Sequence, residues 1–196
     1  MSGGGQRVGL LGGSFNPAHD GHLHISQEAL KHINLDCVWW VVSPQNPLKA
    51  SKNMAPFEDR LADAQAVARD PRIRVTDIET RLDTRFTIDS MRLIQTSFPE
   101  KKFVWIMGAD NLIQFPQWKD WQKMFATVPI AVFDRAPYSV QALAGKAAQV
   151  FARSRLTTQH ARKLADFRPP AWTFFRTPLH PATATEIRAS RNIFPS

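Results

Sequence analysis

The order of apolar and polar residues along the chain predicts strands that alternate with helices. Short apolar runs bounded by turn-forming or polar residues are typical of buried strands, and they occur at 7–13, 37–42, 73–75, 101–110, 128–135 and 171–175. Apolar residues recur at helical spacing over 21–33, 57–69 and 87–97. Because helices of this length connect parallel strands, we predict an α/β fold with a parallel sheet covered on both faces.

The C-terminal part of the chain departs from this alternation. From Pro137 to about Pro170 the pattern is mainly helical and basic, and a further short helix is predicted over 183–190. The simplest organisation is one domain, residues 1–196, in which about 137–196 form a small helical C-terminal elaboration. Residues 1–5 are expected to form a flexible tail.

Length and composition narrow the class of protein. A chain of 196 residues that is 43% hydrophobic can bury one substantial core. The longest uninterrupted apolar run, Cys37 to Val42, is far shorter than the roughly 20 residues of a membrane-spanning helix. We therefore expect a cytoplasmic protein with no membrane partner. The single cysteine, Cys37, excludes an internal disulfide, and its apolar neighbours favour a buried position in a strand.

The net charge of +8 favours a polyanionic partner, which could be a nucleic acid or a nucleotide with several phosphates. The basic residues are dispersed and form no block of the kind that binds nucleic acid. A basic RNA-binding α/β module therefore stays as an alternative that rests on charge alone. Such a module would bind RNA with a steep dependence on salt and would not turn over ATP.

The junction after the first predicted strand, "GGSFNPAHDGHLHI" at residues 12–25, combines glycines with histidines. Gly12 and Gly13 would let the backbone approach a ligand closely, and the start of the following helix offers unpaired amides to an anion. His19 and His22 are three residues apart, so their imidazoles can converge at that helix start. Positioned donors of this kind suit a transition state in which charge builds on phosphate oxygens.

Plainer interpretations also apply to the histidines of this segment. A pair of histidines at this spacing could bind zinc, but no third ligand at a suitable spacing follows, so we assign no metal ligand to the protein. His24 falls on the other side of the helix from His22, so a surface position is expected for it.

The segment "GGSFNPAHDGHL" resembles the signature G-G-[ST]-F-[DN]-P-x-H-x-G-H-L of the nucleotidylyltransferase superfamily. Three later segments, taken in order, are similar to motifs of the bacterial nicotinate-mononucleotide adenylyltransferases. They are "RFTIDSM" at 85–91, "MGADNLIQFPQWKDW" at 107–121 and "TATEIR" at 183–188. The resemblance implies a Rossmann-like, doubly wound parallel sheet. It also implies an enzyme of NAD biosynthesis that transfers AMP from ATP to nicotinate mononucleotide.

The resemblance also implies a role for individual residues. The positions expected to bind ATP are Gly12, Gly13, Ser14, Phe15, Gly108, Asp110, Thr183 and Thr185. The positions expected to act in catalysis are His19, His22, Lys49 and Arg188. The positions expected to bind the acceptor are Asn46, Phe86, Thr87 and Trp118. Mg²⁺ would be held mainly by the phosphates of ATP, the co-substrate.

General chemistry explains how some of these residues could act. Thr87 is predicted to begin a helix, so amides near it could bind a carboxylate. Trp118 could stack on a pyridine ring, whereas Trp121 is expected only to pack a helix against the sheet. Asp110 follows a predicted strand and could accept hydrogen bonds from ribose hydroxyls, cap the helix after it, or do both.

The chain departs from the family pattern at several positions. Leu48 stands where the family commonly has a histidine, so Lys49 is expected to carry more of the charge that faces the phosphates. Phe86 replaces a tyrosine. Nicotinamide mononucleotide and phosphopantetheine remain alternative acceptors, and a homo-oligomer is left open.

Overall fold

A computed structural model of the chain describes residues 5–44 and 54–178. The helix predicted over 183–190 lies outside these residues, as do five candidate site residues. These are Asn46, Lys49, Thr183, Thr185 and Arg188.

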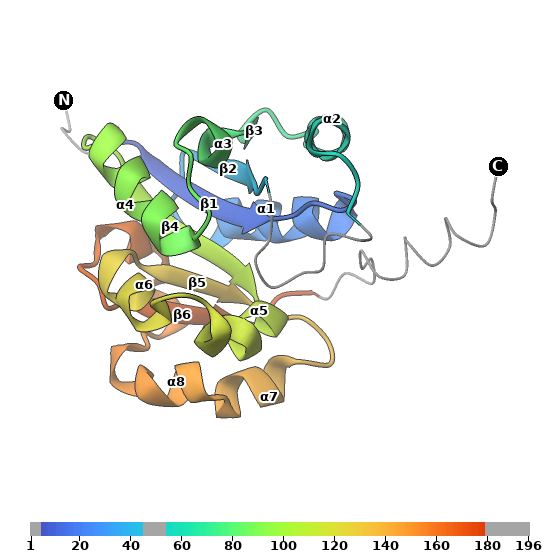
Figure 1. The fold of residues 1–196 in the computed structure, drawn as a ribbon. Coiled ribbons are helices and arrows are strands. Elements are labelled where there is room, and N and C mark those ends of the chain that lie inside the picture. Colours follow the sequence, from blue (N-terminus) through green and yellow to red (C-terminus); the bar gives the residue numbers. More distant parts are fainter. Residues whose placement is uncertain (1–4, 45–53, 179–196) are drawn as a thin grey trace.

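The described residues form one six-stranded parallel sheet. Its strands are β1 (Arg7–Gly13), β2 (Cys37–Val42), β3 (Ile73–Thr76), β4 (Lys102–Gly108), β5 (Ile130–Phe133) and β6 (Trp172–Phe175). Their order across the sheet is β3-β2-β1-β4-β5-β6, which is the order of a Rossmann-like doubly wound fold. The predicted fold class is confirmed, and the strand order reverses between β1 and β4 (Figure 1).

Helices connect the strands as the pattern predicts. The α-helices are α1 (Asp20–His32), α2 (Phe57–Val67), α3 (Ile78–Arg81), α4 (Thr87–Ser97), α5 (Ala109–Gln114), α6 (Trp121–Thr127), α7 (Ser139–Ala144) and α8 (Lys146–Val150). The 3-10 helices are η2 (Phe115–Gln117), η3 (Ala152–Ser154) and η4 (Thr158–Asp166). The predicted helices α1, α2 and α4 end within two residues of their expected bounds, and the helical character of 137–170 is confirmed by α7, α8, η3 and η4.

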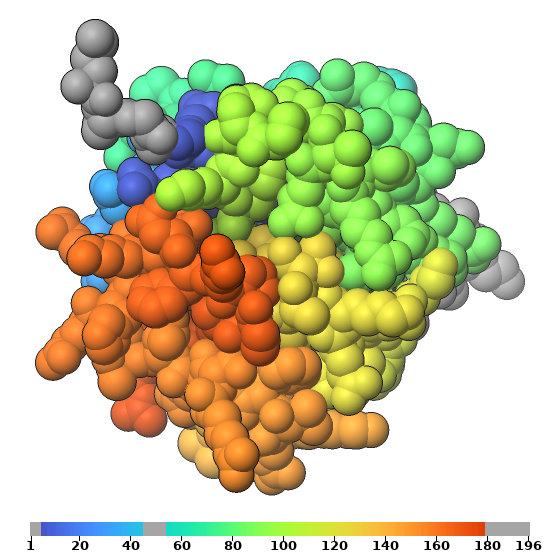
Figure 2. Space-filling model, turned by 90° about the vertical axis from the view of Figure 1, so that its left-hand side faces the viewer, coloured from blue at the N-terminus to red at the C-terminus, as the bar shows by residue number. Residues whose placement is uncertain are grey.

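Two hydrophobic clusters cover the two faces of the sheet. One joins the sheet to α4, α5, α6, α7 and α8, and the other joins it to α1, α2 and η4. Neighbouring residues of β2 point to opposite faces, so Trp39 belongs to the first cluster and Trp40 to the second. All six residues of β2 are buried, as expected for a strand covered on both sides. In the side view, the orange part of the chain, after about residue 140, packs directly against the yellow and green parts that precede it (Figure 2).

Cys37 lies buried in β2, as predicted, and burial raises the pKa of its thiol. A Cβ on Gly5 would overlap the carbonyl oxygen of Glu100, so the backbone at Gly5 lies close against Glu100. The other residues of the tail predicted over 1–5 lie outside the described residues, and the tail stays a prediction. In the two described ranges, no helix has both the length and the apolar character that crossing a membrane requires.

Candidate active site

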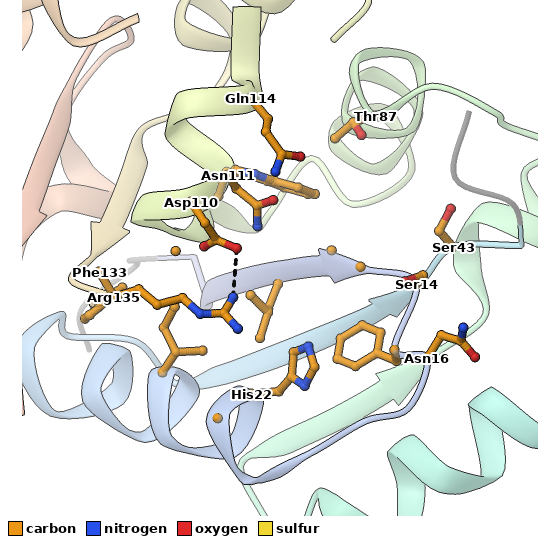
Figure 3. A pocket seen from close by; sticks show the side chains of 18 of the residues that line it. Ser14, Asn16, His22, Ser43, Thr87, Asp110, Asn111, Gln114, Phe133 and Arg135 are labelled. Carbon is orange, nitrogen blue, oxygen red and sulfur yellow. Dashed lines mark hydrogen bonds and ion pairs between the residues drawn. The ribbon is translucent and has the colours of Figure 1, made fainter. Parts of the chain in front are cut away.

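A cavity of about 330 Å³ opens at the carboxyl ends of the central strands. It lies beside the point where the strand order reverses, which is where doubly wound sheets bind ligands. Every candidate site residue within the described part of the chain lines this cavity (Figure 3). These residues are Gly12, Gly13, Ser14, Phe15, His19, His22, Phe86, Thr87, Gly108, Asp110 and Trp118.

The turn after β1 is held by an aromatic residue in an unusual backbone conformation. Phe15 has a φ of 46°, in the left-handed region that non-glycine residues enter at a cost of about 1 kcal/mol or more. Its buried ring stacks on Trp40, with centroids 5.2 Å apart, and lies 4.7 Å from the ring of His22. This packing offsets the backbone strain and fixes the turn.

The glycines of this turn do not adopt the left-handed conformation themselves. None of the described glycines has a positive φ, so Phe15 rather than Gly12 or Gly13 supplies the left-handed residue. Gly12 is required for packing, because a Cβ there would overlap the indole of Trp105. Its lack of a side chain therefore admits Trp105 into the wall of the cavity.

His19 and His22 converge at the start of α1, as predicted. Their ring centroids are 3.9 Å apart. His19 is the residue before the first turn, and its Nδ1 accepts a hydrogen bond of 3.1 Å from the amide of Gly21. The amide of His19 in turn donates to Nδ1 of His22 at 3.2 Å. A backbone amide can only donate, so each neutral imidazole must carry its hydrogen on Nε2. The helix cap therefore gives both rings the same tautomer.

Asp110 is paired with an arginine that the sequence did not single out. Nη1 of Arg135 donates to Oδ2 of Asp110 at 2.8 Å (Figure 3). Oδ1 of Asp110 is buried and has no hydrogen-bond partner among the described residues. The helix-cap interpretation of Asp110 is wrong, because α5 begins at Ala109 and its first turn receives no side-chain cap. One oxygen of Asp110 is thus left for a ligand, and a ribose hydroxyl is a suitable donor.

Aromatic side chains line the side of the cavity beside α4. Trp118 is half-buried and meets Phe115 and Trp105 edge to face, so it packs against the core while also lining the cavity. Trp121 is buried among aromatic residues of the core, which confirms its packing role. Nζ of Lys119 lies 4.4 Å from the ring centre of Phe86. Thr87 is the first residue of α4 and not its cap, which is Phe86, and no side chain caps the first turn.

The expected surface position of His24 is wrong. His24 is half-buried and lines the cavity, and its Nε2 lies 2.7 Å from the carbonyl oxygen of Pro178. The helix turn between His22 and His24 does separate their rings. The hydrogen bond with Pro178 nevertheless brings the segment after β6 into contact with the ring of His24.

Sequence reasoning missed further residues that line the cavity. They include Ser43 after β2, Glu79 in α3, Asn111 and Gln114 in α5, and Asp134 and Arg135 after β5. The rule that ligands bind beyond the carboxyl ends of parallel strands would have indicated Ser43, Asp134 and Arg135. Glu79 has no such signal, because its place depends on how α3 packs.

The cavity offers imidazole and guanidinium donors and backbone amides next to a doubly wound sheet. These properties define a nucleotide-binding α/β protein whose site is suited to transfer at a phosphate. Residues 10–190 match the family described as cytidylyltransferase-like. The chain belongs to this family and, within it, to the nicotinate-nucleotide adenylyltransferases, on the similarities that follow.

Proteins named probable nicotinate-nucleotide adenylyltransferase are similar over nearly the whole chain. One from Parvibaculum lavamentivorans is 50% identical over 184 residues, which are 94% of this chain and 92% of that protein. One from Cereibacter sphaeroides is 49% identical over 93% of this chain and 97% of that protein. The fold also resembles that of nicotinic acid mononucleotide adenylyltransferase from Plasmodium falciparum complexed with NaAD. That match has a TM-score of 0.69 at 15% identity and covers 94% of this chain and 83% of that one.

Proposed function

We propose that the protein transfers AMP from ATP to nicotinate mononucleotide and releases pyrophosphate, forming nicotinate adenine dinucleotide. The observation that carries this proposal is the pair of imidazoles at the start of α1, whose shared tautomer supplies two Nε2–H donors beside the Ser14–Phe15 turn. The names of the relatives at about half identity support the choice of substrates.

The reaction requires positioning and neutralisation of charge rather than a nucleophilic side chain. A phosphate oxygen of the mononucleotide attacks the α-phosphorus of ATP, a new P–O bond forms, and the bond to pyrophosphate breaks in line with it. His19 and His22 would donate hydrogen bonds to phosphate oxygens around the reacting phosphorus as negative charge shifts toward pyrophosphate. Lys49 and Arg188, which lie outside the described residues, would contact the β- and γ-phosphates.

Magnesium fits this site as a partner of the nucleotide. Among residues 5–44 and 54–178, no three His, Cys, Asp or Glu side chains come together as a ligand set. We expect Mg²⁺ to be held mainly by phosphate oxygens and water, where it would supply positive charge to the departing pyrophosphate.

The cavity wall at α4 supports a carboxylate-bearing acceptor. Because no side chain caps the first turn of α4, the amides near Phe86 and Thr87 can bind the carboxylate of the nicotinate ring. The ammonium group of Lys119, close to Phe86, is paired with Asp89 of the first turn of α4 at 3.0 Å, so it offsets the negative charge of that carboxylate beside the same amides. Trp118 would stack on the pyridine ring.

The experiment is a pyrophosphate-release assay with ATP and each of the two pyridine mononucleotides. We expect kcat/KM for nicotinate mononucleotide to exceed that for nicotinamide mononucleotide by at least about ten-fold, because only the acid supplies a charge to the α4 amides. Equal values would contradict the acceptor assignment. Turnover with phosphopantetheine but neither mononucleotide would overturn it, and no pyrophosphate release with any acceptor would overturn the proposed function.

A further inference from the structure

The side chain of Arg60, in α2, is buried behind the turn that follows β1. Only 2% of its surface is exposed, and all of its hydrogen bonds go to backbone carbonyl oxygens. Nη1 donates to Ser14 at 2.6 Å and to Ser43 at 2.8 Å. Nη2 donates to Pro44 at 2.9 Å and Nε to Ala55 at 3.0 Å. One side chain thus joins the turn after β1, the end of β2 and the start of α2.

The positive charge of this guanidinium has no acidic partner in the described part of the chain. None of the ion pairs there includes Arg60, and burial alone lowers its pKa. A buried charge without a counter-charge is costly, and buried arginines are usually paired. The four carbonyl bonds use four of its five N–H donors but supply no net negative charge.

The bond to Ser14 also sets the direction of a neighbouring amide. In a trans peptide, the carbonyl of one residue and the N–H of the next point in opposite directions. Since the Ser14 carbonyl points to the buried guanidinium, the N–H of Phe15 points away from it. Ser14 and Phe15 both line the cavity, so the peptide between them lies in the cavity wall with its carbonyl turned to Arg60.

We propose that Arg60 is a positioning residue for the polyphosphate of the nucleotide, and this inference rests on the proposed function. Arg60 fixes the Ser14–Phe15 peptide so that the Phe15 amide faces the phosphates. Its buried charge, one peptide unit behind the cavity wall, is balanced when the phosphates bind. The favourable effect of Arg60 on binding therefore grows with the number of phosphates on the ligand.

The test measures dissociation constants of adenosine and of ATP by calorimetry for the wild type, R60M and R60K. We expect R60M to weaken ATP binding at least about ten-fold and adenosine binding by less than about three-fold. R60K keeps the charge but makes fewer of the four bonds, so its loss for ATP is expected to lie between those of the wild type and R60M. R92M, which removes an exposed arginine of α4, is the control and should leave both constants within two-fold.

Equal losses for adenosine and ATP would overturn the proposal, because a merely structural role weakens both ligands alike. Unchanged ATP affinity in folded R60M would also overturn it. If R60M does not fold, the test uses R60K. We expect R60K to weaken ATP binding about three-fold and adenosine binding by less. The binding measurements use no acceptor. The Arg60 proposal can therefore fail while the wild type still releases pyrophosphate with nicotinate mononucleotide, so the two proposals are tested separately.

Discussion

The tautomers of His19 and His22 follow from the backbone around them. Both Nδ1 atoms are occupied by amide donors of the same helix start, so neither ring can present Nδ1–H while it is neutral. An isolated imidazole divides its hydrogen between the two nitrogens. Here the helix cap makes that choice before any ligand binds.

Replacement of His22 by alanine tests this arrangement. We expect kcat to fall about 10²- to 10³-fold, because one donor to the reacting phosphate is lost. The measurement is steady-state pyrophosphate release with both substrates saturating. The exposed His160, changed to alanine, is the control and should leave kcat unaltered. Turnover of H22A equal to that of the wild type would contradict the role of this imidazole.

Some residues of the site could be predicted from the sequence and others could not. The motif positions around the β1 turn were found because their residue types are unusual at such a junction. Arg60 and Glu79 could not be found, since a charged residue in a helix is normally exposed. Their burial depends on carbonyl and hydroxyl groups from distant parts of the chain, which no local pattern reveals.

At the scale of elements, a buried carboxyl group joins α3 to α4 beside the acceptor side of the cavity. Oγ of Ser90 donates to Oε1 of Glu79 at 2.7 Å and lies 2.9 Å from Oγ1 of Thr84. The hydroxyl of Ser43, at the end of β2, also hydrogen-bonds to Glu79. Burial raises the pKa of Glu79, although these hydroxyl groups partly oppose the shift.

The substitution Glu79→Gln tests this raised pKa. A folded-state pKa above the ordinary 4.5 means that the folded protein holds this proton more tightly than the unfolded chain. The contribution of Glu79 to stability is therefore present below pH 4.5 and lost as pH rises through the folded pKa. We expect the free energy of unfolding of the wild type to fall relative to that of E79Q over this range, as measured by urea denaturation. A difference that does not change with pH would contradict the assignment.

The strands and the long helices could be predicted from the sequence, whereas the short helices could not. The bounds of β1, β2 and α4 follow from continuous apolar runs and from helical periodicity over several turns. The helix α3, with four residues, is too short to establish a period. Between Gly108 and Val128 the pattern changes within a few residues, so the separate helices α5, η2 and α6 were not distinguished.

At the scale of the whole molecule, an acidic residue joins the C-terminal elaboration to the amino ends of two central strands. Asp166 ends η4, and its carboxylate lies 2.6 Å from Nζ of Lys102 and 3.1 Å from Nη2 of Arg7. The hydrogen bond from Lys102, followed by that from Arg7, lowers the pKa of Asp166. This cluster lies at the opposite end of the sheet from the cavity.

The variant Asp166→Asn should lower stability without changing activity. Because the folded pKa is lowered, the carboxylate contributes stability above its ordinary value of 3.8 and loses it as pH falls through the folded value. The three side chains are partly exposed, so we expect a loss below about 1 kcal/mol at neutral pH. The free energy of unfolding of D166N should be lower than that of the wild type at neutral pH and equal to it at acid pH. An equal deficit at both would contradict the ion-pair explanation.

The order of the strands is the property of the whole molecule that no local pattern could provide. Alternation of strands and helices predicts a parallel sheet, but it does not say that β4 pairs with β1. That pairing brings Gly108 and Asp110 beside the β1 turn and so creates the cavity. The sequence placed these residues in one site only through the family resemblance.

The close approach of Trp105 to Gly12 has a spectroscopic consequence. Trp105 and Trp118 both line the cavity, and Trp40 lies against the Phe15 and His22 rings. Indole emission responds to polarity and to stacked rings in its surroundings. A bound nucleotide would therefore quench or shift the intrinsic fluorescence, and the protein carries its own optical reporter of occupancy without any attached dye.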